Sequence, residues 1–474
     1  MKYMWEGRFK EEVDRDIIEF TKSIDIDKKL AIYDLKGSIA HTKMLSKVGL
    51  ISKKEEEKIL KGIEKIEEEV KKDKFKILST DEDIHTAIER RLIEIIGPVG
   101  EKLHTARSRN DQIVLDEKLY LKDSIVNILE GIINLQRIFL KKSEEYHNVI
   151  ISAYTHLKQS QPILISHYFL AYIEKFERDK ERFLSAYKRV DVLPLGVGAC
   201  SGTTLKIDRE YLSKLLNFSK ISRNSLDTVS DRDFLVEIAF CCITTLLHLS
   251  NFCEDIIIWN MDEINYVILP DKFCTGSSLM PHKKNPDIFE LIRGKTGSCI
   301  GLLTGLLTLL KGLPLSYNRD LQEDKKLLFE IVETLNFSLI ILSKVVKEIK
   351  FNKERIEKSI SSFTLSTDIA EYLVKKGVPF RKAHRIVGQI INYCIDNNKD
   401  LFSLSIDEFK KFSNFFDEDL LNILNFYNSI NLKTSEGGTS LSNVKKEIKR
   451  WKKDLKKSSH LILSLKEGNF ILKK

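Results

Sequence analysis

One segment of the chain, residues 276–286, combines two hydroxyls, several basic side chains and an amide with flexible, small residues. It reads Gly-Ser-Ser-Leu-Met-Pro-His-Lys-Lys-Asn-Pro, and a helical pattern begins directly after it at Asp287. The free N–H groups at the start of a helix, together with Lys283 and Lys284, make a positive environment in which an anion can bind. Such a loop could stabilise a carboxylate or a carbanion. A mobile loop that only caps the next helix explains the composition equally well.

His156 is a second candidate for chemistry, because imidazole exchanges protons near neutral pH. It follows Thr155 in a predicted loop between two long helices. A general acid needs partners that orient it, and a lone histidine is more often structural. From its position alone, His156 is a candidate acid with a structural alternative.

Long helices must position these segments, since proline and glycine are scarce over long intervals and apolar residues recur three and four apart. Residues 119–145 carry such a stripe, and comparable patterns occupy about 162–189, 232–266, 287–311 and 321–350. Five long helices in succession predict an all-α fold with a central long-helix bundle and few strands. Apolar residues on more than one helix face predict burial against neighbouring helices or other subunits, and a homo-oligomer is therefore expected.

Changes in the length of the predicted helical segments divide the chain into three predicted helical domains. A smaller N-terminal domain spans residues 1–105, and the central bundle spans 106–360. A smaller C-terminal domain spans 361–474, where shorter helical segments are interrupted by Gly377-Val378-Pro379.

The composition is typical of a folded globular protein, with 42% apolar residues in 474. The net charge of +8 is spread along the chain and interleaved with acidic residues, which argues against a nucleic-acid partner. The densest basic run, Lys445 to Lys457, contains apolar residues at helical spacing and predicts an amphipathic helix that covers a core. These apolar residues are Val444, Ile448, Trp451 and Leu455.

Other classes of protein are disfavoured by what the sequence lacks. Seven cysteines without a Cys-x-x-Cys pair predict reduced, mainly structural thiols and no metal site. Apolar stretches such as 299–310 are shorter than the roughly 18 to 20 residues of a membrane span, so no membrane partner is expected. Charged residues among Met1 to Arg8 predict no leader peptide and a cytoplasmic location. No nucleotide or flavin motif is visible, so we expect no cofactor.

The order of residues in 276–286 resembles the signature loop of the fumarase, aspartase and argininosuccinate lyase superfamily, with every fixed position present. Segments 81–86, 103–112, 154–157 and 317–325 resemble argininosuccinate lyases in particular, and a further segment, residues 366–380, resembles their C-terminal domain. The resemblance covers nearly the whole chain. It implies a carbon–nitrogen lyase that cleaves argininosuccinate to arginine and fumarate by β-elimination, the last step of arginine biosynthesis.

Two departures from the family pattern concern loops. Ala106 stands where the family usually has glycine, and Gly198-Ala199-Cys200-Ser201-Gly202 replaces a more usual Gly-Ala-Leu-Ala-Gly. Neither change affects a residue that is expected to move protons, so they concern loop geometry and rate, not the type of reaction.

The resemblance implies catalytic roles for four residues. Ser277 would take the proton beside a substrate carboxylate, and loop closure that brings Lys283 near its oxygen would favour the alkoxide. Lys283 and Asn285 would stabilise the dianionic aci-form of that carboxylate. His156 is the candidate acid, and the resemblance pairs it with Glu290. Without the resemblance, Ser277 would be interpreted as a helix cap.

The resemblance also implies a substrate pocket that supplies both signs of charge. Its residues would be Ser23, Asp83, Arg109, Asn110, Thr155, Asn285, Tyr317, Gln322 and Lys325. Arg109, Asn110 and Lys325 suit carboxylates, whereas Asp83 suits a cationic group. Structural alternatives exist: Arg109 and Lys325 as surface ion-pair partners, and Tyr317 as a core residue. His85 is expected to be structural or to support the binding residues.

Members of the family are homotetramers in which three subunits contribute to each active site, so the segments around 110, 156 and 277 would come from different chains. Three alternatives stay open: a sister enzyme such as adenylosuccinate lyase, a non-catalytic crystallin-like relative, and a helical scaffold or nucleic-acid binder. The segments 107–111 and 320–325 favour argininosuccinate lyase over its sister enzymes.

Overall fold

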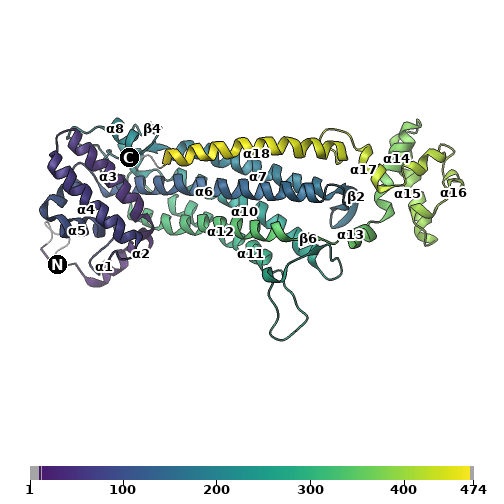
Figure 1. The fold of residues 1–474 in the computed structure, drawn as a ribbon, viewed down its shortest axis with the longest axis horizontal. Helices are drawn as coiled ribbons and strands as arrows, with labels where there is room; N and C mark the ends of the chain where they lie inside the picture. The colour runs from purple at the N-terminus through teal and green to yellow at the C-terminus, as the bar shows by residue number, and fades with distance from the viewer. Residues whose placement is uncertain (1–9, 12, 470–474) are drawn as a thin grey trace.

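The computed structural model describes residues 10–11 and 13–469 of the chain. The described part of the protein is mostly helical, with a long central bundle and a smaller helical domain at each end (Figure 1). This architecture confirms the all-α fold predicted from the spacing of apolar residues. The segment Met1 to Arg8, on which the expected location rests, lies outside the described residues.

Five long helices form most of the central bundle. They are α6 (Arg109–Glu145), α7 (Ile165–Val190), α10 (Asp233–Asn260), α11 (Asp287–Leu310) and α12 (Asp324–Glu348). Each overlaps one predicted helix. α6 begins well before the apolar stripe that starts at residue 119, because Ser108 and Asp111 form a reciprocal capping box that fixes its first turn.

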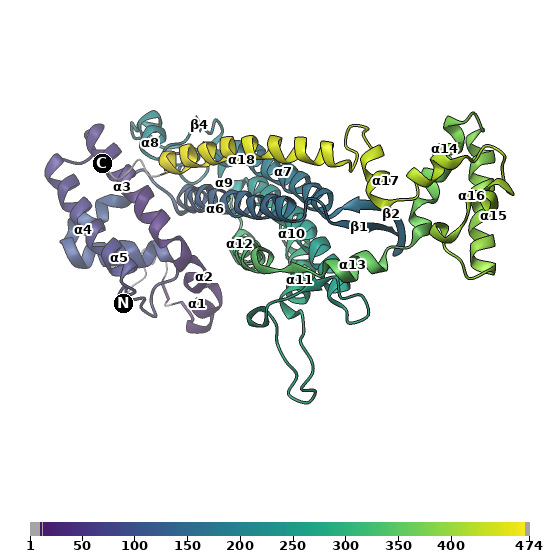
Figure 2. The ribbon, with the colours of Figure 1, turned by 45° about the vertical axis from the view of Figure 1, so that its right-hand side comes forward.

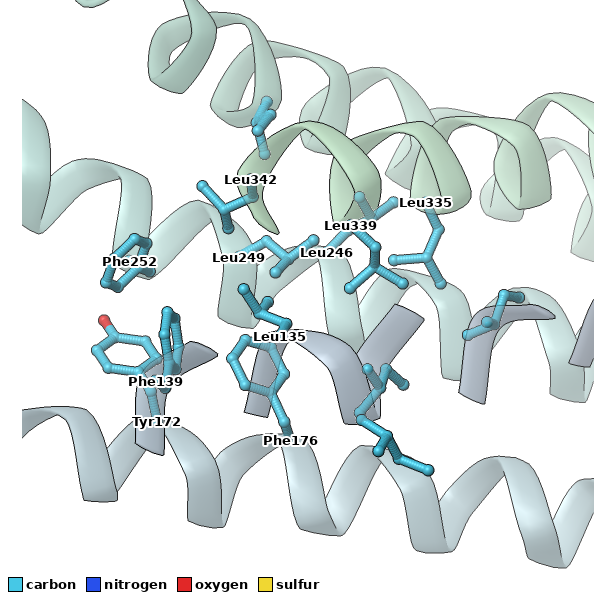
Figure 3. Packing of buried hydrophobic residues seen from close by; sticks show 14 of the residues in the cluster. Leu135, Phe139, Tyr172, Phe176, Leu246, Leu249, Phe252, Leu335, Leu339 and Leu342 are labelled. Carbon is cyan, nitrogen blue, oxygen red and sulfur yellow. The ribbon is translucent and has the colours of Figure 1, made fainter. Parts of the chain in front are cut away.

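The bundle has one continuous core, because each long helix packs against at least two others. Figure 3 shows part of this core, where side chains of α6, α7, α10 and α12 meet. The ring of Phe139 on α6 lies 5.4 Å from that of Phe169 on α7 and 5.0 Å from that of Phe252 on α10. Such aromatic contacts contribute about 0.5–1.5 kcal/mol each beyond the area that they bury. The frame that carries the loops is therefore rigid.

Within the part of the chain that the structure describes, α10 is the one helix long and apolar enough to cross a membrane, by length and composition alone. The expectation that apolar stretches stay below this length was wrong for α10. In the structure 56% of its most apolar window is buried, and the helix packs against α7, α11 and α12. Burial in the bundle accounts for its composition.

The N-terminal domain has a core of its own. The domain contains α1 (Arg15–Thr21), α2 (Ile24–Asp27), α3 (Ala31–Lys47), α4 (Lys53–Lys71) and α5 (Ile84–Ile96). This core also includes Leu193, Leu195 and Leu212 from the segment after α7, which contains α8 (Arg209–Leu215) and leads to α9 (Ser225–Ser230). The predicted domain 1–105 is therefore incomplete, because the chain returns to this end of the bundle after α7.

The C-terminal domain lies at the opposite end of the bundle (Figures 1 and 2). It has its own core, whose residues lie between 369 and 420. It contains α14 (Ser366–Lys375), α15 (Phe380–Asp396) and α16 (Ile406–Lys410), and α13 (Lys353–Ser359) and α17 (Phe426–Leu432) connect it to the bundle. The last helix, α18 (Leu441–Asn469), instead runs back along α6 and α7. The predicted domain 361–474 was therefore too long.

α18 confirms the predicted amphipathic helix. Its residues Val444, Ile448, Trp451 and Leu455 are buried in the core of the bundle. The lysines between them face outward or pair with acidic residues of neighbouring helices, as Lys452 does with Glu144.

Strands are few, as predicted, and among the described residues they form three two-stranded sheets. β1 (Ile150–Thr155) pairs antiparallel with β2 (Lys158–Leu164), β3 (Val192–Leu193) parallel with β4 (Lys220–Ile221), and β5 (Val267–Ile268) antiparallel with β6 (Lys350–Phe351). The β1–β2 hairpin occupies the connection between α6 and α7, where the sequence predicted a loop.

Candidate active site

A pocket of about 680 Å³ lies where the N-terminal domain meets the first turns of α6 and α12. Seven of the residues that were predicted to bind substrate line it: Ser23, Asp83, Arg109, Asn110, Tyr317, Gln322 and Lys325. They come from four segments that are distant in the sequence. Their convergence on one cavity is therefore a property of the tertiary fold.

Asp83 and Arg109 form one charged pair of the pocket, and each is placed by the start of a helix. Asp83 caps α5 and accepts hydrogen bonds from the N–H and the hydroxyl of Thr86 at 2.6 and 2.8 Å. Arg109 begins α6, and its Nε lies 3.5 Å from the Asp83 carboxylate. Burial raises the pKa of Asp83, but Arg109, His85 and the bonds from Thr86 together hold that pKa below its usual value. The carboxylate is therefore ionised at neutral pH and can hold a cationic group.

Asn110 links the pocket to the loop that departs from the family pattern. Its Nδ2 donates a hydrogen bond to the carbonyl of Ala199 at 3.1 Å. The neighbouring Asp111 is buried, and its Oδ2 accepts from the N–H groups of Gly196 and Gly198 at 3.0 and 2.9 Å. The substituted side chains of this loop are exposed and make none of these contacts. The departures therefore leave the anchoring of the loop to α6 intact.

Lys325 lines the pocket although only 3% of its surface is exposed. It lies in the first turn of α12, with its Nζ 3.0 Å from Asp324 Oδ1 and 3.7 Å from Glu117 Oε1. Burial lowers the pKa of Lys325, but the two carboxylates outweigh burial and hold the pKa above its usual value. The ammonium therefore stays charged, and it has donors for a substrate carboxylate.

Three more of the predicted binding residues contribute polar groups to the pocket. The Ser23 hydroxyl donates to the buried carboxylate of Asp27. The Gln322 amide donates to the carbonyl of Thr21 at 3.1 Å. Burial raises the pKa of the Tyr317 phenol, which therefore keeps its proton as a donor at neutral pH.

Thr155 and His156 lie at the tip of the β1–β2 hairpin. His156 and Leu157 are its two turn residues, with φ angles of 54° and 57°, as in a type I′ turn. Side chains other than glycine and asparagine adopt this left-handed conformation at a cost of about 1–2 kcal/mol each. The side chains of Thr155, His156 and Leu157 are all exposed. The turn thus presents the imidazole to the outside of the chain.

Ser277, Lys283 and Asn285 lie on the loop between β5 and α11, which extends away from the bundle in both views (Figures 1 and 2). Backbone hydrogen bonds between Thr275 and Asn285, at 2.8 and 3.4 Å, close the base of this loop. The Ser277 Oγ accepts from two backbone N–H groups of the loop at 3.0 and 3.2 Å. Bonds donated to an oxygen favour its negatively charged form, which a serine base requires.

Glu290 lies in the first turn of α11 and is exposed. Among the described residues, no hydrogen bond joins Glu290 to His156. In one chain the β1–β2 hairpin, the loop before α11 and the N-terminal domain, whose residues line the pocket, occupy separate places along the bundle (Figure 1). The four predicted catalytic residues, and Thr155 and Asn285, therefore do not meet the seven pocket residues within a single chain.

Sequence reasoning missed part of this site. Arg319 lines the pocket and donates to the Thr21 carbonyl at 2.8 Å and to Glu82 at 2.5 Å. Asp27 lies on the pocket as a buried carboxylate. Two sequence features could have indicated these residues. Arg319 lies within the 317–325 segment, and Asp27 follows Ser23 at the spacing of one helical turn.

Ala106 adopts a φ angle of +58°, so the usual glycine of the family is replaced at a left-handed position. An alanine is strained there, and we expect Ala106→Gly to stabilise the protein by about 0.5–1 kcal/mol. The thermal-unfolding midpoint should rise. In the control Ala171→Gly, at an exposed site within α7, the midpoint should fall, because glycine weakens a helix interior. A fall for both variants would contradict strain at Ala106.

The chain is similar to known proteins along nearly its whole length. A model of the lyase family matches residues 7–301, and a model of the argininosuccinate lyase C-terminal region matches residues 363–431. The curated argininosuccinate lyase of Sulfurihydrogenibium sp. (strain YO3AOP1) is 49% identical over 456 residues, which cover 96% of this chain and 99% of that protein. The chain belongs to the argininosuccinate lyase family.

A second family member, the argininosuccinate lyase of Syntrophus aciditrophicus (strain SB), is 48% identical over 94% of this chain and 95% of its own length. Among solved structures, EDDS lyase in complex with formate shares the fold, with a TM-score of 0.83 at 24% identity over 94% of this chain and 90% of that one. Membership of the argininosuccinate lyase family confirms the resemblance seen in the sequence motifs.

Proposed function

We propose that this protein is an argininosuccinate lyase that cleaves argininosuccinate to arginine and fumarate. The observation that carries the proposal is the 49% identity to a curated argininosuccinate lyase over almost the full length of both proteins. The pocket supports it, since Arg109 and Lys325 suit the substrate's carboxylates and Asp83 suits its cationic end.

In the proposed reaction, Ser277 takes a proton from the carbon beside a carboxylate, and the electrons of that C–H bond form the double bond of fumarate. The carbon–nitrogen bond breaks, and the guanidinium nitrogen receives a proton from His156, oriented by Glu290. Lys283 and Asn285 stabilise the negative charge that develops on the carboxylate. The two N–H groups that donate to Ser277 Oγ support its role as the base.

The proposed active form is a homotetramer whose sites combine the pocket of one subunit with the hairpin and the 275–285 loop of others. Two observations support it. The three elements lie apart in a single chain, and α10, α11 and α12 leave large apolar side chains exposed, which mark subunit contacts in many oligomers. These exposed residues are Phe240, Leu247, Leu291, Ile300, Leu307, Phe337 and Ile340.

We also propose a cytoplasmic location. All seven cysteines are free thiols, and five of them are buried. Reduced cysteines are typical of cytosolic proteins.

The test is an assay of the purified protein with argininosuccinate, adenylosuccinate, malate and aspartate in separate reactions. Fumarate is followed by the ultraviolet absorbance of its conjugated double bond. We expect fumarate from argininosuccinate alone. Fumarate from adenylosuccinate, malate or aspartate would instead identify a sister enzyme, and no product from a folded tetramer would favour a crystallin-like structural relative.

A further inference from the structure

Four ionisable side chains form a buried cluster beside the pocket: Lys325, Asp324, Arg232 and Glu117. Each has at most 3% of its surface exposed. Glu117 lies in the third turn of α6, Arg232 is the N-cap of α10, and Asp324 and Lys325 begin α12. Burial raises the pKa of Glu117 to about 8, so this carboxyl is mostly protonated at neutral pH. Of the four, Lys325 alone lines the pocket.

Asp324 connects the cluster, because its two carboxylate oxygens bind different cations. Oδ2 accepts from Arg232 Nε at 2.6 Å, and Oδ1 lies 3.0 Å from Lys325 Nζ. Glu117 lies farther from both cations, 3.4 Å from Arg232 Nε and 3.7 Å from Lys325 Nζ. Burial raises the pKa of Asp324, but Lys325 and Arg232 outweigh it and keep the pKa below its usual value. The bridging carboxylate is therefore ionised.

Arg232 is itself held in place from the other side. Its Nη1 donates to the backbone carbonyl of Asp231 at 2.8 Å, directly before α10. The position of the Lys325 ammonium therefore depends on a chain of contacts that begins at the backbone of Asp231, passes through Arg232 and Asp324, and ends at the pocket. A flexible lysine side chain would otherwise lose rotamer entropy each time it bound a ligand.

A buried ion cluster is weak support for stability as such, because desolvation of the charges opposes their attraction. Stability alone therefore does not explain the cluster. Because Lys325 lines the pocket, the cluster can act in ligand binding instead. We propose that Asp324 is a positioning residue, locked by Arg232, that fixes the Lys325 ammonium where it binds a carboxylate of the substrate. This proposal rests on the proposed function in one respect, namely that the pocket takes a polycarboxylate.

The first test is steady-state kinetics of the Asp324→Asn variant. This change keeps the shape of the side chain, removes its charge and places an amide NH2 group next to one of the two cations. We expect KM for argininosuccinate to rise about ten-fold or more, and kcat to change less than about three-fold, since a binding contact is lost. Arg232→Lys, which keeps the charge but loses the planar fork, should raise KM by a smaller factor.

The matched control is Asp179→Asn on α7. Asp179 is also buried and also bridges two basic groups, with Oδ1 2.9 Å from Arg182 and Oδ2 2.7 Å from His248, but it does not line the pocket. Its amide variant should lose thermal stability and keep the wild-type KM. If Asp324→Asn also loses only stability, with KM unchanged, the cluster is structural and the proposal is overturned.

A double-variant cycle shows whether Asp324 acts through Lys325. In the Lys325→Met background, Asp324→Asn should cause no further rise in KM, because the group that it positions is absent. Independent effects that multiply in the double variant would contradict the proposal. If Asp324→Asn does not fold, Arg232→Lys takes its place in the cycle.

Calorimetric binding of succinate, a non-reacting dicarboxylate, separates this proposal from the proposed function. If the wild type does not cleave argininosuccinate, the proposed function is wrong. The positioning role is still supported if Asp324→Asn binds succinate more weakly than both the wild type and Asp179→Asn do. Equal succinate binding by all three proteins, or none by the wild type, overturns it.

Discussion

Replacing Ser277 with alanine should reduce the turnover of argininosuccinate by about a thousand-fold or more, because the reaction loses its proposed base. The fold should not change. Ser277 lies on a loop outside the bundle core, where its Oγ accepts two backbone hydrogen bonds and supports no buried contact. The measurement is the rate of fumarate formation at saturating substrate, with the thermal-unfolding midpoint as a check on folding.

The neighbouring hydroxyl provides the matched control. Ser278 is exposed and lies on the same loop, so Ser278→Ala makes the same chemical change one residue away. It should retain most of the activity. Equal losses of activity in the two variants would indicate that the geometry of the loop, and not the Ser277 hydroxyl, determines the rate. Full activity of Ser277→Ala would show that Ser277 is not the base.

Two inactive variants should regain activity when their subunits are mixed. His156→Asn and Ser277→Ala should each be nearly inactive as homotetramers. In one chain the hairpin that carries His156 and the loop that carries Ser277 are separate, so a shared site takes each from a different subunit. With random mixing in equal amounts, about a quarter of the sites combine an intact His156 with an intact Ser277.

Co-expression with two affinity tags would isolate mixed tetramers, and light scattering would verify their mass. Activity near a quarter of the wild-type value supports sites shared between subunits. If both residues of a site came from the same chain, no mixed tetramer would contain an intact site. Absence of recovery in verified mixed tetramers would therefore contradict the shared-site arrangement.

The long helices could be predicted from the sequence because their stability depends on a repeating pattern of burial. Leu129, Ile132 and Ile133 recur at helical spacing, and all three are buried in the core of the bundle. Seven pocket residues could also be anticipated, because whole segments resemble those of the family. The polar signature loop was identified for the same reason.

The hairpin could not be predicted, since its turn lacks the glycine or asparagine that signals a type I′ turn. His156 and Leu157 occupy the two left-handed positions in their place. The buried cluster beside the pocket was equally hidden. Glu117, Arg232 and Asp324 look like ordinary surface residues in the sequence, and only tertiary packing shows that they are buried together.

The return of α18 along the bundle has a consequence for how the chain folds during synthesis. Trp451 fills the core beside helices that are made some 300 residues earlier, and Lys466 pairs with Glu130 at 2.6 Å. The N-terminal domain draws much of its core from early residues and can form while translation continues. The bundle, by contrast, keeps an apolar groove open until the last helix leaves the ribosome. A chain that stops before residue 441 is therefore expected to be a target for chaperones and proteases, even though every residue of the pocket and the two loops has already been made.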